Sequence, residues 1–211
     1  MGIENIMVFL GAGVLVNLYP GPDTFYIVGR SIAQGKIAGV SAALGISTGA
    51  MVHTLLGAFG LSALIATSAH AFMVLKFVGA GYLIYQGITM LFVKNHKNPR
   101  IQESSAKENF GKIYRQGALT NIFNPKVAMF FIAFLPQFIS PESPDKVISF
   151  IILGSVFITT GTIWCLIVAV FASSMSRKLR SNSSVAKWLM KINGVLFISL
   201  GLRLATAKMN N

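Results

Sequence analysis

The sequence has few acidic side chains and a single cysteine. Only 6 of its 211 residues are Asp or Glu, against 18 Lys or Arg, and charged residues make up 11% of the chain. Soluble globular domains contain about 25% charged residues, so this shortage argues against a soluble domain. Because Cys165 has no second cysteine to pair with, the chain alone can form neither an internal disulfide nor a cysteine-based metal site.

Most of the sequence consists of long apolar segments with few charged residues. Apolar residues make up 54% of the chain, and a helix that crosses a membrane needs about 20 mostly apolar residues. Segments of this kind lie at 3–29, 37–67, 70–93, 117–139, 146–174 and 186–206. The bilayer core offers no water to peptide groups, so continuous spans of this length should be helices. We therefore predict an all-α membrane protein with six transmembrane helices.

The basic residues gather in alternate connections between these spans. Arg30 and Lys36 lie between spans one and two, and further Lys and Arg residues lie in the connections at 95–115 and 177–187. By the positive-inside rule these connections are cytoplasmic, which places both termini outside. The loop at 95–115 has almost no aromatic residues, so we expect its positive charge to contact the head groups of membrane lipids and not nucleic acid.

Two stretches of the sequence resemble each other. NLYPGPDTFYI begins at Asn17 and NIFNPKVAMFF begins at Asn121, and both run from Asn through an aliphatic and an aromatic residue to a proline-containing break. The dipeptide Thr-Gly also recurs, at 48–49 in the second span and at 160–161 in the fifth. The order and the separations are similar, so the chain reads as two copies of a three-span unit.

An odd number of spans per copy has a consequence for topology. The second copy must enter the membrane from the opposite side, which gives inverted-topology repeats, the architecture of many secondary transporters. We expect one transporter domain over 1–211, with repeat one at 1–94, the cytoplasmic basic loop at 95–115 and repeat two at 116–211.

The first predicted span is interrupted by Pro20, Gly21 and Pro22. Proline lacks an amide hydrogen and clashes with the preceding turn, so the helix should unwind or kink there. A structural kink packed against neighbouring helices is one interpretation. Asp23 favours a functional one, because an aspartate inside a membrane helix costs about 2.5 to 3.5 kcal/mol on insertion scales and usually faces a pathway or a partner.

The fourth predicted span repeats the interruption with the opposite charge, at Asn124, Pro125 and Lys126. Pseudo-symmetry can bring Asp23 and Lys126 toward one cavity, and a buried ion pair that holds the repeats together is the alternative. Half-helix amino ends suit a carboxylate, so we predict a small zwitterionic substrate with its carboxylate toward Lys126 and its ammonium toward Asp23. The predicted substrate-binding residues are Asn17, Pro20, Gly21, Pro22, Asp23, Asn121, Asn124, Pro125 and Lys126.

Two further features of the second span are open to two interpretations each. His53 can exchange protons together with Asp23, or it can be a hydrogen-bonded core histidine. The glycines from Gly35 to Gly49 allow close helix contact, either within one protomer or between two protomers of a homodimer.

Enzymatic chemistry has few candidate residues in this sequence. Thr54 follows His53, so the H-E-x-x-H pattern of a metalloprotease is absent, and the other aspartate, Asp145, lies in an outer loop. No nucleotide-binding G-x-x-x-x-G-K-[ST] motif occurs. We expect a secondary transporter without a cofactor or metal, and a channel or a lipid-interacting membrane protein is the alternative.

Four stretches together resemble the LysE/RhtB family of amino-acid exporters. They are PGPDTFYIVGRSIAQGKIAGVSAALGISTGAMVH, KFVGAGYLIYQG, TNIFNPKVAMFFIAFLPQF and INGVLFISLGLRLA, and they are spread over nearly the whole chain. The resemblance implies a bacterial inner-membrane exporter of basic or neutral amino acids or close derivatives, driven by proton exchange. Within it, the segments 20–23 and 124–126 match the motifs of the first and fourth spans.

Overall fold

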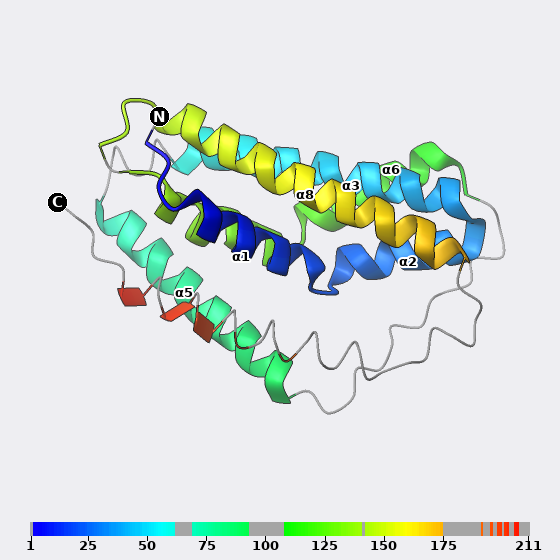
Figure 1. The fold of residues 1–211 in the computed structure, drawn as a ribbon, viewed down its shortest axis with the longest axis horizontal. Coiled ribbons are helices and arrows are strands. Elements are labelled where there is room, and N and C mark those ends of the chain that lie inside the picture. The colour runs from blue at the N-terminus through cyan, green and yellow to red at the C-terminus, as the bar shows by residue number, and fades with distance from the viewer. Residues whose placement is uncertain are drawn as a thin grey trace.

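The computed structural model describes residues 2–61, 69–92, 108–140 and 142–174, together with scattered positions between 191 and 206. These residues are mostly helical, which confirms the all-α class (Figure 1). The α-helices are α1 (Ile6–Leu18), α2 (Pro22–Gln34), α3 (Lys36–Leu56), α5 (Ala69–Phe92), α6 (Phe110–Ile122), α7 (Pro125–Met129) and α8 (Lys146–Ser174). Two π-helical turns, η1 (Gly57–Leu61) and η2 (Phe130–Phe134), and the 3-10 turn η3 (Leu135–Phe138) extend α3 and α7.

Several of these helices are long and apolar enough to cross a membrane. Within the described ranges, Lys36–Gly60 and Lys146–Ser174 qualify alone, with 25 and 29 residues. Two bent pairs qualify when each is taken as one span, α1 with α2 and α6 with Pro125–Phe138. Helix α5 corresponds to the predicted third span, while most of the predicted sixth span at 186–206 lies outside the described residues.

The two bent pairs break where the sequence places its prolines. Helix α1 ends at Leu18 and α2 begins at Pro22, and α6 ends at Ile122 and α7 begins at Pro125. Proline suits the first helical position because its fixed φ is helical and its missing N–H has no partner there anyway. The two halves that precede the breaks have 13 residues each, and the bends are 49° and 48°.

Some helix limits differ from those predicted from apolar content. Helix α2 extends to Gln34, so Arg30 is helical rather than part of a loop, and Lys36 is the first residue of α3. Gly35 alone connects the two helices, at φ 85°, a backbone conformation that favours glycine. Helix α6 begins at Phe110, inside the predicted basic loop. The parts of α2 and α6 that extend beyond the apolar segments are polar, and Arg30 of α2 contacts Gln116 of α6 there.

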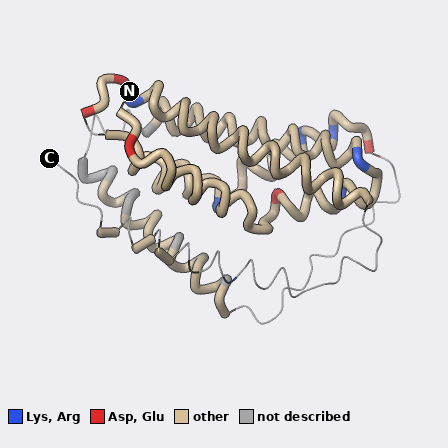
Figure 2. The backbone as a smooth tube through the Cα atoms, in the orientation of Figure 1, with Lys and Arg blue, Asp and Glu red and all other residues tan. Residues whose placement is uncertain are grey.

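Close packing holds α3 against α6, the first half of the second broken span. A Cβ atom at Gly45 would collide with the backbone of Tyr114, and one at Gly49 would lie 2.7 Å from the Cβ atom of Asn121. These glycines of the second span therefore serve contacts within the protomer. Charged residues gather toward the two ends of the helices and are sparse along their middle (Figure 2).

Candidate functional site

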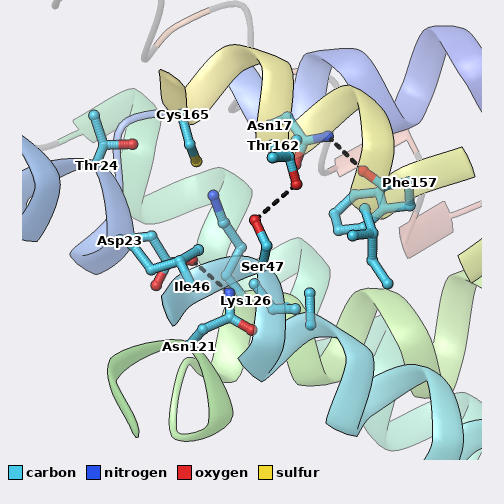
Figure 3. Close-up of a pocket in the computed structure, with 14 residues that line it drawn as sticks. Asn17, Asp23, Thr24, Ile46, Ser47, Asn121, Lys126, Phe157, Thr162 and Cys165 are labelled. Carbon is cyan, nitrogen blue, oxygen red and sulfur yellow. Dashed lines mark hydrogen bonds between the residues drawn. The ribbon is translucent and has the colours of Figure 1, made fainter. Parts of the chain in front are cut away.

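A cavity lies between the two helix breaks, closed on its other sides by α3 and α8 (Figure 3). Its lining includes Asp23 from the first break, Lys126 from the second, Ser47 from α3 and Cys165 from α8. The space open to the centres of water molecules is about 40 Å³, and one water needs about 10–15 Å³ by this measure. The cavity therefore has room for only a few water molecules in this conformation and must widen to admit a larger solute.

Asp23 lines this cavity and has one carboxylate oxygen without a hydrogen-bond partner. Its side chain is buried, and Oδ2 accepts hydrogen bonds from Nδ2 of Asn121 and Nδ2 of Asn124, each at 2.9 Å. Its Oδ1 is buried without a hydrogen-bond partner, and so is Oδ1 of Asn121. Buried acceptors without a partner cost free energy, so each of these oxygens can accept from a donor group that none of the described residues supplies.

Lys126 closes the carboxyl end of α1. Its Nζ donates to the carbonyl oxygens of Val16 at 3.1 Å and Tyr19 at 3.2 Å. The break leaves these carbonyls without the helical donors they would otherwise have, and a cation at a helix carboxyl end is favourable. Among the described side chains, the ion pairs within 4.0 Å are those of Glu108, so Lys126 and Asp23 share a cavity without a direct ion pair.

The remaining predicted residues of the breaks fall into two groups. Asn17 lines the cavity and donates from Nδ2 to the Phe157 carbonyl at 3.4 Å and to Thr160 Oγ1 at 3.3 Å. Asn124 lies behind Asp23 and caps α7 by accepting from the Lys126 amide at 3.0 Å. The backbone of Pro20, Gly21, Pro22 and Pro125 shapes the breaks, and these four residues are not part of the cavity lining.

His53 lies outside the cavity lining. The side chain is buried, its Nε2 is 3.1 Å from the carbonyl oxygen of Asn121, and its ring stacks on Phe131 with centroids 5.8 Å apart. This environment matches the alternative of a hydrogen-bonded core histidine. Through the Asn121 carbonyl, His53 supports a residue that does reach the cavity.

Sequence reasoning missed the α3 and α8 side of the site. Ser47 Oγ and Thr162 Oγ1 are 2.7 Å apart and both line the cavity, as do Phe157 and Cys165. A signal was present, because Ser47 and Thr162 flank the two recurring Thr-Gly dipeptides inside otherwise apolar spans.

The same dipeptides make matching contacts across the two halves of the chain. A Cβ atom at Gly49 would lie 2.7 Å from Cβ of Asn121, and one at Gly161 would lie 3.0 Å from Oδ1 of Asn17. The asparagine before each break thus packs on the glycine of the other half.

Comparison with known proteins agrees with the membrane character of the fold. The sequence profile described as LysE type translocator matches residues 14–208. The chain is 28% identical to an uncharacterized membrane protein, YrhP, of Bacillus subtilis, over 95% of this chain and 98% of that protein. It is 26% identical to a leucine efflux protein of Salmonella typhimurium, over 97% of this chain and 96% of that protein.

No solved structure matches the chain. The family match covers both helix breaks and both recurring Thr-Gly dipeptides. The chain therefore belongs to the LysE type translocator family.

Proposed function

We propose that this protein is a secondary transporter that exports neutral amino acids or close derivatives from the cytoplasm in exchange for protons. The observation that carries the proposal is the buried, unpartnered Oδ1 of Asp23 at a cavity between two broken helices. Family membership and the leucine efflux relatives favour an amino acid as the solute.

The α-ammonium of the substrate fits the unpartnered oxygen of Asp23. An ammonium group has three donors and a positive charge, and Oδ1 of Asp23 is a carboxylate oxygen without a hydrogen-bond partner. Asn121 and Asn124 hold the other oxygen of Asp23, so the carboxylate is oriented before the substrate arrives. Preorganisation of this kind lowers the entropy cost of binding.

The α-carboxylate of the substrate fits Lys126. Two of the three N–H donors of Nζ go to the carbonyls of Val16 and Tyr19, which leaves one donor and the positive charge for a ligand. Lys126 lines the same cavity as Asp23, so a zwitterion can contact both.

The rest of the cavity favours an uncharged substrate side chain. Much of the lining is apolar, with Ile46, Val127, Phe157 and Ile158 among its residues. Asp23 is the one carboxylate of the lining, and in our proposal it binds the α-ammonium. A lysine or arginine side chain would then be desolvated beside Lys126 without a counter-charge, which is costly.

Proton exchange follows from the same carboxylate. When the ammonium leaves, an ionised Asp23 would remain buried without a positive group in contact, which is unfavourable at membrane depth. A proton on Asp23 neutralises it for the return step, so the site carries either substrate or proton. We assign this exchange to Asp23 rather than to His53, because Asp23 lines the cavity.

Alternating access of two inverted repeats is the mechanism we propose. It is supported by the equal lengths of α1 and α6, the 49° and 48° bends and the matching asparagine–glycine contacts across the two halves. In such transporters one repeat rocks against the other around a central site. With the basic connections in the cytoplasm of a bacterial cell and both termini outside, export runs toward the side of the termini.

Ligand analogues test the site. We expect leucine to raise the melting temperature of the purified protein in detergent, while 3-methylbutylamine, which lacks the carboxylate, and 4-methylpentanoate, which lacks the amine, act weakly. A ligand at about 100 times its Kd stabilises by about 2.7 kcal/mol. Asp23→Asn should remove the response, and Asp145→Asn should keep it, because Asp145 is exposed at the start of α8. Equal responses to leucine and lysine would contradict the neutral side-chain preference, and no response to any amino acid would favour a channel or a lipid-interacting protein.

A further inference from the structure

Polar contacts join α2 to the segment that begins α6. Arg30 Nη2 lies 3.0 Å from Glu108 Oε2 and donates a hydrogen bond to Gln116 Oε1 at 2.7 Å. The hydroxyl of Tyr26 donates to the Ile113 carbonyl at 2.8 Å and also lies 3.0 Å from Gln116 Oε1. We call Tyr26, Arg30, Glu108 and Gln116 the polar latch.

The polar latch lies beyond Asp23 along α2. Arg30 follows Asp23 by seven residues on α2, which is about 10 Å along a helix. The Arg30 and Glu108 side chains are each 16% exposed, whereas Lys112, the other partner of Glu108, is 61% exposed and 3.6 Å away. The attraction within an ion pair is stronger when the pair is partly shielded from water. Arg30 is therefore the stronger of the two partners of Glu108.

Aromatic rings pack between α1 and the helix that follows the second break, and one of them, Phe130, stacks on the lining residue Phe157. Phe9 of α1 lies 6.0 Å from Phe130 and 5.3 Å from Phe138 between ring centroids, and Phe134 contacts both of these rings. We call Phe9, Phe130, Phe134 and Phe138 the aromatic seal. All four are at most 2% exposed.

Backbone hydrogen bonds fasten the aromatic seal at its outer edge. The Glu4 amide donates to the Phe138 carbonyl at 2.9 Å, and the Ser140 amide donates to the Gly2 carbonyl at 2.7 Å. This end therefore excludes water, while the polar latch can exchange its contacts for water.

The two closures are formed by corresponding elements. If α1 corresponds to α6 and α2 to the helix after Pro125, then the contact of α2 with α6 is the repeat-related counterpart of the contact of α1 with α7 to η3. We infer that the polar latch and the aromatic seal are two gates of one transport path, which open one at a time. The structure has both gates closed, in keeping with the small size of the cavity.

The different chemistry of the gates predicts which opens more readily. Separating Arg30 from Glu108 exposes charged groups that water solvates well. Separating the aromatic seal exposes apolar surface at about 25 cal/mol per Å². The cavity should therefore open more often through the polar latch, on the side of the basic loop. For the exporter proposed above, this is the side from which substrate is loaded.

Cys165 makes this inference measurable without any knowledge of the solute. It is the single cysteine of the sequence and lines the cavity, so a membrane-impermeant, charged methanethiosulfonate reagent reports access from whichever side it is added. The protein would be studied in sealed vesicles of both orientations, with Cys165→Ser as the unlabelled control.

We expect Glu108→Gln to raise the labelling rate about fivefold from one side only, a change equivalent to about 1 kcal/mol. Lys112→Gln is the matched control on the same carboxylate and should leave the rate nearly unchanged. Phe9→Leu should raise labelling from the opposite side. Rates would be compared only for protein that elutes as a single folded species, so that misfolding is not read as opening.

Three results would overturn the inference. Labelling that rises equally from both sides in Glu108→Gln would mean that the contact stabilises the fold and not a gate. If the labelling rate of Cys165 rises from the same side in Glu108→Gln and Phe9→Leu, both residues lie at the same end of the path. If the labelling rate changes in neither variant, neither residue belongs to a gate. Because labelling requires no transported solute, a failure here is distinguishable from failure of the amino-acid proposal.

Discussion

At the residue scale, Asp23 keeps one oxygen available because Asn121 and Asn124 occupy the other. Two amide donors on Oδ2 fix the rotamer of the carboxylate and leave Oδ1 without a partner. In the proposed function, Oδ2 orients the carboxylate and Oδ1 binds the substrate. That role would account for a carboxylate at a helix break, where its burial is costly.

Lys126 also stabilises the carboxyl end of α1, a role that its position in the sequence does not predict. Its charge and the proline before it predicted a buried cation near the second break, which the structure confirms. The hydrogen bonds to Val16 and Tyr19 depend on where the carboxyl end of α1 lies in space, and no local pattern encodes that.

Lys126→Gln should therefore destabilise the protein even without substrate. The change removes a charged donor from two buried carbonyls, which costs about 1–3 kcal/mol. Thermal unfolding of the purified protein in detergent measures it, and Lys112→Gln is the exposed control that should unfold like the wild type. An unchanged melting temperature for Lys126→Gln would mean that Lys126 does not support α1 and serves the ligand alone.

At the element scale, the breaks were predictable and the helix limits were not. Pro20, Pro22 and Pro125 place the interruptions because proline cannot sit in a helix interior without losing a hydrogen bond. Beyond the apolar segment, Arg30 of α2 contacts Glu108 and Gln116, which are far from it in the sequence. Apolar content alone therefore ended the predicted span too early.

The contact between Gly49 and Asn121 tests how tightly the halves are packed. Gly49→Ala places a Cβ atom 2.7 Å from both the Ala118 carbonyl oxygen and the Asn121 Cβ atom, and overpacking of this kind costs about 1–3 kcal/mol. Gly11→Ala is the control, because nothing lies within 4 Å of its Cβ position, and alanine there should be neutral or stabilise the helix by up to about 1 kcal/mol.

Melting temperatures of the two alanine variants in detergent decide the matter. If both variants unfold at the same temperature as the wild type, the two halves of the chain are not packed closely at Gly49. The asparagine–glycine contacts would then no longer support the proposal of two repeats.

At the scale of the whole molecule, composition and spacing predicted a helical membrane protein with a polar centre. Hydropathy gives the class because the bilayer imposes spans of about 20 residues. Charge in the middle of spans marks the centre because it is expensive there. The α3 and α8 wall of the cavity, with Ser47 and Thr162 in contact, was missed because neutral polar side chains are common in membrane helices and carry little signal one at a time.

Gradient-driven exchange in proteoliposomes tests the central claim most directly. Vesicles containing the wild type, Asp23→Asn or the exposed control Asp145→Asn would be loaded with labelled leucine or lysine, with and without an imposed proton gradient. We predict saturable loss of leucine that the gradient accelerates, little loss of lysine, and no gradient-driven loss in Asp23→Asn, while Asp145→Asn behaves like the wild type. Leucine flux that persists in folded Asp23→Asn, with the same dependence on the proton gradient, would contradict the assignment of both substrate and proton to this carboxylate.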